Sequence, residues 1–347
     1  MADTLKQTAI VSINGNGGSK KEQLAVDGSG NGYELYISDG QTAQQPVVLE
    51  GIAWETERQG SPGKLTFTVV KNGALSFQEG DTVIFKVGGA GIFYGYVFKK
   101  QRNKEQQIQV TAYDQLRYFK NKHTYLYQNK RADEILNMIA GDFNLRVGSI
   151  DNTGYVIKSR IEDDQTLFDI MQNALDLTLL AKGRTYVLYD EFGQLALKDI
   201  VNLKTDYYLD AETAEDFDYI SSIEDTYDKI QVYEDTDKGV RNYYIAQDGE
   251  NIAKWGMLQK TEKLNDGENG AEKAKQMLSL YNQKTRTLSI SGALGSTKVR
   301  AGSLIAVSLS LGDVIANTYM LVEKASHTFS NGTHTMNLTL RGGGLIT

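Results

Sequence analysis

Apolar and polar residues alternate over short runs near both ends of the chain. Such runs cover residues 33–38, 47–54 and 64–71, and similar runs recur between residues 287 and 340. A period of two is typical of half-buried strands, and the glycines between the runs favour tight hairpin turns. The pattern therefore predicts antiparallel strands arranged in small barrels or sandwiches.

The two strand-rich regions contain a repeat. Residues 80–113 and 302–340 each begin with a glycine and continue as a strand, a tight reversal, an aromatic strand and a closing alternating strand. The residues differ between the two regions, but the order and the approximate spacing agree. Two similar β modules in one chain indicate an internal duplication.

A period near 3.6 replaces the period of two after Lys130. Apolar residues at spacings of three and four predict an amphipathic helix from Ala132 to Phe143. A second helix is expected after Thr166, whose hydroxyl can cap it with Asp169 three residues later. Two strands joined by a reversal complete a compact α/β unit: residues 184–189 and 194–198.

The expected fold class is α+β, mainly β, with two similar antiparallel β-barrel domains separated by a small α/β domain. A third helix, over residues 271–281, precedes the second repeat. The expected divisions are a Gly/Ser/Lys-rich N-terminal arm, a first tube-like β-barrel domain, the α/β domain, and an acidic segment with a helix and the second tube-like barrel: residues 1–32, 33–118, 119–205 and 206–347.

Composition narrows the class of protein. The 347 residues, 40% of them hydrophobic, suffice for two or three domains with their own cores. No apolar run is long enough for a membrane span, the N-terminus lacks a secretory signal pattern, and the absence of cysteine excludes disulfides and thiolate metal sites. A net charge of −7 argues against a general DNA-binding surface. Synthesis in a bacterial cytoplasm is the expectation.

No cofactor or metal site is predicted. The glycine clusters at residues 15–20 and 28–32 do not lie between a strand and a helix, as a phosphate-binding loop would. His327 and His334 flank a hairpin and could face one another, but without a third ligand a surface or hydrogen-bonding role is favoured over a metal site.

Catalytic residues are not assigned either. Carboxylate pairs such as Glu162 with Asp164, or Glu224 with Asp228, are sequence neighbours, whereas a glycosidase needs two carboxyl groups across a cleft. Two alternatives to a structural role are kept: a peptidoglycan-directed hydrolase, and a cell-wall glycan-binding module with exposed aromatic platforms.

Charge is segregated along the chain. Residues 99–131 carry nine Lys or Arg against two acidic residues, interleaved with tyrosines, which is similar to a surface for single-stranded nucleic acid. Residues 206–237 carry twelve acidic residues against the single base Lys229. The favoured interpretation of the basic run is a protein interface, with the acidic stretch of a neighbouring copy as its complement.

Several ordered blocks of sequence resemble a known family, the tail-hub proteins of PBSX-like prophages within the late control D group of contractile tails. The resemblance covers about residues 33–342. The blocks that carry it are WETERQGSPGKLTF at 54–67, FYGYVF at 93–98, VTAYDQLRY at 110–118, TLFDIMQNALDL at 166–177, AQD at 246–248, KWG at 254–256, LYNQKTR at 280–286, VRAGS at 299–303 and YMLVEK at 319–324.

The resemblance implies a non-catalytic baseplate hub. Three chains would present six barrels in a pseudo-sixfold ring that joins a hexameric tail tube protein to a trimeric spike protein. Baseplate wedge proteins and the tape-measure protein are further expected partners. The protein would be assembled into a virion or a tail-like particle, without membrane insertion, and DNA would pass only transiently through its channel.

Two groups of residues are expected to carry this role. The strands of the two repeats would build the ring with Phe93, Tyr94, Tyr96, Phe98, Tyr319, Leu321 and Glu323. Part of the acidic stretch would face the channel and lower the adhesion of exiting DNA: Asp216, Asp218, Glu224 and Asp225.

Overall fold

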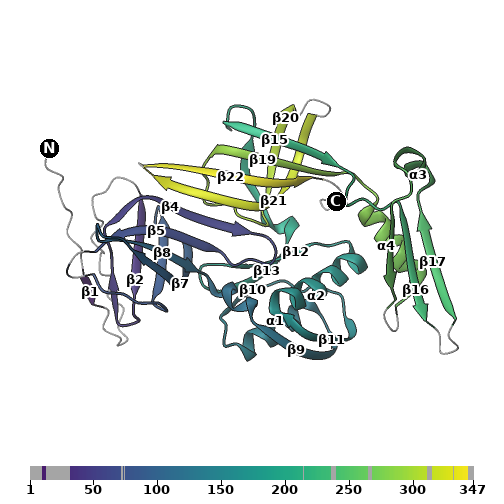
Figure 1. The fold of residues 1–347 in the computed structure, drawn as a ribbon, viewed down its shortest axis with the longest axis horizontal. Helices are drawn as coiled ribbons and strands as arrows, with labels where there is room; N and C mark the ends of the chain where they lie inside the picture. Colours follow the sequence, from purple (N-terminus) through teal and green to yellow (C-terminus); the bar gives the residue numbers. More distant parts are fainter. Residues whose placement is uncertain are drawn as a thin grey trace.

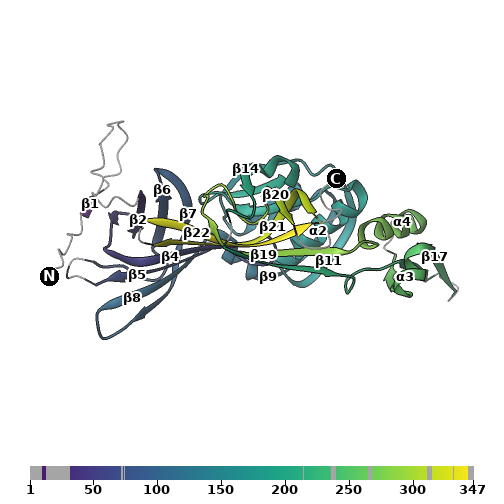
Figure 2. The same cartoon turned by 90° about the horizontal axis from the view of Figure 1, so that it is seen from above.

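One hydrogen-bonded sheet runs through most of the elongated molecule in this computed structural model (Figures 1 and 2). The structure describes residues 10–12, 32–71, 73, 75–213, 215–235, 240–264, 268–310, 315–330 and 332–342. The predicted N-terminal arm, residues 1–32, lies outside the described residues except for 10–12 and Gly32.

The first module, residues 33–113, is an antiparallel sheet with the short strand β1 beside β3. Its strands are β1 (Ile10–Ser12), β2 (Tyr33–Ser38), β3 (Thr42–Gln44), β4 (Val48–Glu57), β5 (Lys64–Val70), β6 (Thr82–Val87), β7 (Ala90–Arg102) and β8 (Gln107–Tyr113). Their order in the sheet is β1-β3-β2-β6-β7-β8-β5-β4. Period-two burial follows from the alternation in sequence, since Leu65, Phe67 and Val69 of β5 all point into the core.

The α/β lobe, residues 115–203, follows the first module. Its elements are the 3-10 helix η1 (Gln115–Lys120), β9 (Lys122–Lys130), α1 (Ala132–Asp142), β10 (Val147–Ile150), β11 (Ile157–Thr166), α2 (Leu167–Lys182), β12 (Tyr186–Asp190), β13 (Leu195–Asp199) and the 3-10 helix η2 (Ile200–Leu203). β9 pairs with β11, and β10, β13 and β12 form a separate small sheet. Helices α1 and α2 pack together over one core to which both contribute, including Ile135, Leu136 and Ile170.

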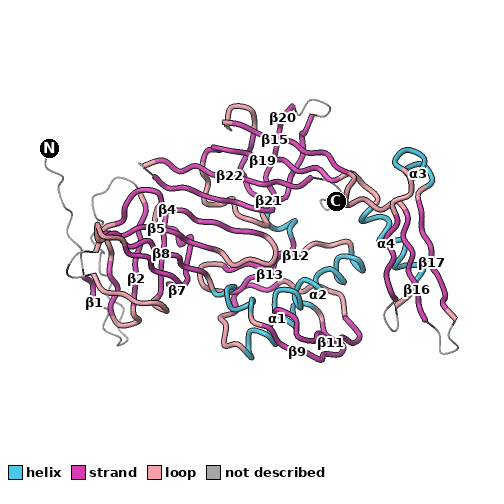
Figure 3. Tube along the Cα trace, viewed as in Figure 1, coloured by secondary structure: helices cyan, strands magenta, loops and turns pink. Residues whose placement is uncertain are grey.

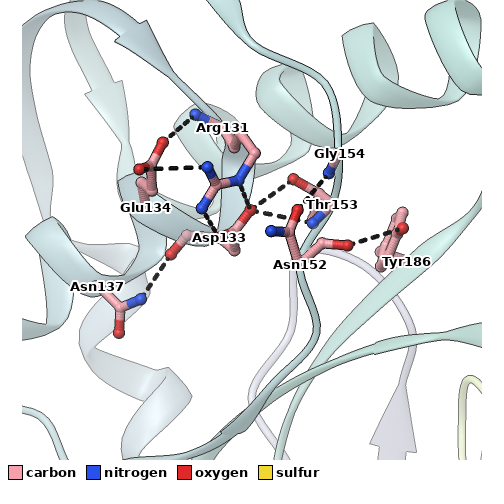
Figure 4. A network of polar contacts seen from close by, with 8 residues as sticks. All are labelled: Arg131, Asp133, Glu134, Asn137, Asn152, Thr153, Gly154 and Tyr186. Carbon is pink, nitrogen blue, oxygen red and sulfur yellow. Dashed lines mark hydrogen bonds and ion pairs between the residues drawn. The ribbon is translucent and has the colours of Figure 1, made fainter.

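A polar network fixes the start of α1 (Figure 4). Asp133 receives two hydrogen bonds from the Arg131 guanidinium, at 3.0 and 2.8 Å, and two more from the backbone and hydroxyl of Thr153. Burial opposes ionisation of Asp133, but these donors outweigh it and hold the pKa of its carboxyl below the usual value. The network ties the loop after β10 to the helix.

The start of α2 confirms the capping prediction. The Thr166 hydroxyl accepts a hydrogen bond from the backbone N–H of Asp169 at 3.1 Å. The helix ends at Gly183, which takes a left-handed conformation with φ of 65°. The Thr166 cap accounts for the start of this helix and the left-handed Gly183 for its end.

The second module comprises residues 204–222 and 285–342. Its strands are β14 (Lys204–Leu209), β15 (Asp216–Ser222), β19 (Thr285–Leu294), β20 (Leu304–Ser310), β21 (Ile315–Ser330) and β22 (Thr333–Gly342). Their order is β14-β20-β21-β22-β19-β15. The pairings are antiparallel except between β14 and β20, which run parallel.

An inserted lobe, residues 223–284, interrupts the second module between β15 and β19. It contains β16 (Lys229–Asp235), β17 (Arg241–Gln247), α3 (Gly249–Trp255), β18 (Gln259–Lys263) and α4 (Gly270–Tyr281). Its small core includes Ile230, Val232 and Met277. Figure 3 shows this lobe at one end of the molecule, and its entry and exit are joined at the pair Ser222 and Thr285.

The fold class is mainly β with a central α/β lobe, as predicted, but the two closed barrels are not confirmed. The hydrogen-bonded order of the described strands is an open path. A barrel closes when its first and last strands pair, whereas β4 pairs here with β21 of the other module. The two modules therefore share one sheet.

Candidate assembly interface

The two repeats share the same hydrogen-bonding framework. Gly80 and Gly302 both adopt the left-handed region, with φ of 94° and 93°. The Gly80 N–H donates to the carbonyl of Val97, and the Gly302 N–H donates to the carbonyl of Val322, each at 2.8 Å. Glycine stands at both positions because an L side chain is strained at such a φ.

The turn before each of these strands is also the same. The backbone N–H of Gln78 donates to the Asp81 carboxylate at 2.8 Å, and the N–H of Arg300 donates to the Ser303 hydroxyl at 2.9 Å. The carbonyls of Asp81 and Ser303 then accept the N–H groups of Val97 and Val322, at 2.8 and 2.9 Å. A carboxylate and a hydroxyl thus perform the same local task in the two copies.

Strand registers agree residue by residue. Between β7 and β8 the register shifts between Val97 and Lys99, and between β21 and β22 it shifts between Val322 and Lys324. Lys99 lies opposite Thr111, as Lys324 lies opposite Thr339. The shared bulge bends both sheets at the same point.

Strand order extends the equivalence to five strands. The sequence of neighbours β6-β7-β8-β5-β4 in the first module corresponds to β20-β21-β22-β19-β15 in the second. Leu65 of β5 lies opposite Trp54, and its counterpart Leu288 of β19 lies opposite Tyr219. β15 is thus the counterpart of β4.

A seam between β4 and β21 joins the two modules. Lys324 to Phe329 lie opposite Glu57 to Ile52 in an antiparallel ladder, and the N–H of Arg58 extends it by donating to the Glu323 carbonyl at 2.9 Å. The Arg58 guanidinium also binds the Glu323 carboxylate at 2.6 Å. We call this ladder the internal seam.

Aromatic packing reinforces the internal seam. The rings of Trp54 and His327, which lie opposite each other, stack with their centroids 4.6 Å apart. Phe329, from the second module, is buried in the core of the first module against Phe85. The seam is therefore packed as well as hydrogen-bonded.

A buried charged cluster lies where the α/β lobe meets both modules. Asp114 and Asp190 are almost fully buried, and the Arg300 guanidinium donates to the Asp190 carbonyl at 2.9 Å. Burial raises the pKa of Asp190 to about 6, and burial together with the neighbouring Asp190 charge raises the pKa of Asp114 well above its usual value. Asp114 also accepts a hydrogen bond from the N–H of Gly63 at 2.9 Å.

The predicted ring residues divide between the interior and the lobe contacts. Phe93 and Leu321 are buried in the chain, and Tyr94 packs on Phe192 of the α/β lobe with the Arg146 guanidinium 4.4 Å from its ring centroid. The others lie as follows: Tyr96 and Phe98 near Tyr118, Tyr319 below Lys204, and Glu323 in the internal seam. Their participation in a ring of several chains remains a prediction.

The predicted channel residues all lie on or beside β15. Asp216 and Asp218 are exposed on that strand, and Glu224 and Asp225 are in the turn that leads into the inserted lobe. That these carboxylates face a channel also remains a prediction.

Four of the side chains considered for chemistry have structural partners: His327, His334, Glu162 and Asp164. His327 Nδ1 lies 2.9 Å from His334 Nε2 and His327 is buried, so of the two roles left open, surface or hydrogen-bonding, the structure shows the hydrogen-bonding one. Glu162 is buried and receives hydrogen bonds from Tyr127, Arg160 and Asn173, whereas Asp164 of the same strand pairs with Lys122 at the surface. Within the described ranges, no group of three or more His, Asp or Glu side chains is placed to hold a metal ion.

The sequence did not predict the internal seam. Residues 54–58 and 319–324 are among the blocks that carry the family resemblance, but nothing in either block indicates that they meet. The glycine that begins each repeat was visible in the sequence, but the matching bulges were not.

The chain shares its fold with solved structures of tail proteins. A tail protein from Neisseria meningitidis superimposes with a TM-score of 0.68 at 11% identity, over 90% of this chain and 98% of that one. The 43 kDa tail protein of prophage MuSo2 from Shewanella oneidensis gives 0.65 at 13% identity, over 88% and 98%. The E. coli c3393 protein, a component of the type VI secretion system, gives 0.54 at 11% identity, over 88% and 76%.

Sequence comparison identifies the family. The YqbQ-like family model matches residues 52–341, and the chain belongs to this family. It is 34% identical to the uncharacterised protein YqbQ of Bacillus subtilis over 88% of this chain and 95% of that protein. It is 33% identical to the XkdQ protein of the phage-like element PBSX of the same bacterium, over 84% and 92%. No helix in the described ranges is long and apolar enough to cross a membrane.

Proposed function

We propose that this protein is a non-catalytic baseplate hub of a contractile phage tail or tail-like particle. Three copies form a ring of six quasi-equivalent modules that joins the hexameric tail tube protein to the trimeric spike protein. Wedge proteins and the tape-measure protein are its further partners in the assembled particle. DNA, where the particle carries it, passes through the ring.

One observation carries the proposal: the two modules repeat the same glycine turn, bulge and strand order. Two equivalent modules per chain give three chains a pseudo-sixfold arrangement, which matches a hexameric tube on one side and a threefold spike on the other. A single-module chain would need six copies to make the same contacts.

The acidic side chains on and beside β15 suit the same role. Asp216, Asp218, Glu224 and Asp225 lie close together in sequence, and a wall of carboxylates repels the DNA backbone. Facing the channel, they reduce the adhesion of a passing polyanion.

The experiment is the mass of the protein in solution, alone and mixed with the tube protein of its own gene cluster. We expect a three-chain species, and electron microscopy should show rings stacked on the end of the tube. A protein that stays a single chain in both conditions and never joins a tube contradicts the hub function.

A further inference from the structure

The duplication leaves two strand edges without the partners that their counterparts have. In the second module, residues 324–329 of β21 pair with β22 on one edge and with β4 on the other. Their counterparts in the first module are the residues of β7 from Lys99 onward. Among the described strands, these residues pair with β8 on one edge and with no strand on the other. β15, the counterpart of β4, is likewise the last strand of the sheet.

The internal seam provides a template for these two edges. Lys324 is equivalent to Lys99, because both follow the bulge and both lie opposite a threonine of the next strand. Trp54 is equivalent to Tyr219 through their leucine partners. His327 is three residues after Lys324 and Arg102 is three residues after Lys99, so these two residues are equivalent. Because His327 lies opposite Trp54 in the internal seam, the template puts Arg102 opposite Tyr219.

We propose that β15 of one copy pairs antiparallel with the outer edge of β7 in a second copy, repeating the internal seam between chains. The register places Lys99 opposite Ser222, Gln101 opposite Ile220 and Arg102 opposite Tyr219. The Ile223 N–H donates to the Phe98 carbonyl, as the Arg58 N–H does to the Glu323 carbonyl in the internal seam.

Charge favours this partner. The β7 segment and the turn after it carry four basic residues, Lys99, Lys100, Arg102 and Lys104, against Glu105. Lys100 already pairs with Glu79 and Lys104 with Glu105, which leaves Lys99 and Arg102 as the charges without an ion pair among the described residues. β15 carries the exposed carboxylates Asp216 and Asp218, so the two edges attract each other when they belong to different chains. The same segregation makes each edge repel a second copy of itself, which disfavours symmetric pairing of like edges.

The side chains of β15 also favour a covering strand. Phe217 and Ile220 are exposed by 41% and 51% on this terminal strand. The Tyr219 hydroxyl is buried without a hydrogen-bond partner among the described residues. Arg102 of a second copy would place a guanidinium, with its several N–H donors, beside the Tyr219 ring. Its position corresponds to that of His327, which stacks on Trp54 in the internal seam.

A head-to-tail contact between two different edges makes either a closed ring or an open filament. The inference rests on the proposed function, because the hub requires the closed ring of three copies. Closure at three copies gives six seams, three within chains and three between them. The outer edges of β7 and β15 are then all paired, and the closed sheet has no unpaired edge at these strands.

Disulfide trapping tests the pairing, and the chain has no native cysteine to interfere. The variants Gln101→Cys and Ile220→Cys are mixed, oxidised mildly and run on a non-reducing gel. Residues directly opposite in an antiparallel pair have Cα atoms about 4.5–5.5 Å apart, which is within the Cα separation of a disulfide. We expect a shift from one-chain to two-chain mass that requires both variants, and a covalent three-chain circle from the double variant.

Two matched controls sharpen the test. Ser326→Cys with Glu55→Cys places the same pair in the internal seam, where an intramolecular disulfide is expected. Gln101→Cys with Asp216→Cys moves one cysteine four residues along β15, about 13 Å away, where little cross-linking is expected.

The outcomes separate the inference from the hub function. Rings on the tube without the Gln101–Ile220 disulfide, while the internal control forms, overturn the strand pairing and leave the hub intact. Equal cross-linking to Asp216→Cys overturns the register. A chain that stays single in every condition, with no intermolecular disulfide, contradicts both.

Discussion

At the scale of the residue, two glycines occupy equivalent turns in different surroundings. Gly80 and Gly302 have nearly the same φ, but a Cβ added at Gly80 meets no atom within 4 Å, whereas one at Gly302 lies 2.6 Å from Val187 Cγ1. The conformation is therefore a property of the repeat, and the crowding is a property of the contact with the α/β lobe.

The pair predicts unequal costs for the same substitution. Gly80→Ala should lower the free energy of unfolding by about 1–2 kcal/mol, the strain of a left-handed L residue. Gly302→Ala should cost about 1–3 kcal/mol more, because Val187 must move to make room. Urea unfolding of the two variants measures the difference, and equal midpoints would show that the two turns are equally crowded.

His327 predicts a sensitivity to acid. Burial, with a smaller effect of His334, lowers the pKa of His327 to about 3, so in the folded protein it stays neutral where an unfolded histidine takes up a proton. Stability is complete above about pH 6.5 and falls by about 1.4 kcal/mol per pH unit as the pH drops toward 3. The contribution is thus present at neutral pH and lost in acid.

The measurement is urea unfolding at pH 7 and pH 5 for the native protein and for His327→Gln. The variant loses the stacking on Trp54 and is less stable at pH 7, but its decline between the two pH values should be smaller by about 2 kcal/mol. An unchanged decline would mean that other groups carry the acid sensitivity.

At the scale of the element, α2 depends on a short-range cap. Thr166→Ala removes the acceptor for the Asp169 N–H and should lower the free energy of unfolding by about 1 kcal/mol. Thr166→Ser keeps the hydroxyl and serves as the control, and its free energy of unfolding should change by only a few tenths of a kcal/mol. Chemical denaturation measures both variants. An equal loss of stability in the two would assign the effect to the threonine methyl group.

The strands show a second regularity at this scale. β7 and β21 have different residues, yet the two strands share a bulge at an equivalent point, after Val97 and after Val322. A bulge inserts an extra residue, bends the strand and increases its local twist. In β21 the residues after the bulge bind β4, and this arrangement is the basis for assigning a partner to β7.

At the scale of the whole molecule, the inserted lobe is a candidate for removal. Its ends meet at Ser222 and Thr285, which are already paired across β15 and β19. Replacing residues 223–284 by Asn-Gly should therefore close a hairpin without disturbing the registers of the second module. Leu180 of α2, which packs against this lobe, becomes more exposed and some stability is lost.

Circular dichroism and thermal unfolding of the shortened protein check this expectation. A single cooperative transition at a lower midpoint is expected, with most of the strand signal kept. Loss of cooperative unfolding would show that the second module needs the inserted lobe to fold.

Sequence periodicity was sufficient for the elements with one buried face. The 3.6 period and the Thr166 cap predicted α1 and α2, and the period-two runs at residues 33–38 and 64–71 predicted β2 and β5 close to their observed bounds. The repeat was also visible, because glycine recurs wherever the backbone needs a left-handed turn. Short α3 and the limits of the inserted lobe were not predicted, since neither has a long periodic pattern.

The sequence by itself determined the longer helices, most strands of the two repeats, the duplication and the lack of thiol chemistry, because these depend on residues close together in the chain. Only the tertiary structure decided that β4 joins β21, that the modules share one open sheet, and that Trp54 meets His327. A strand edge offers the same N–H and C=O groups whatever its sequence, so its partner is chosen by long-range packing that no local pattern records.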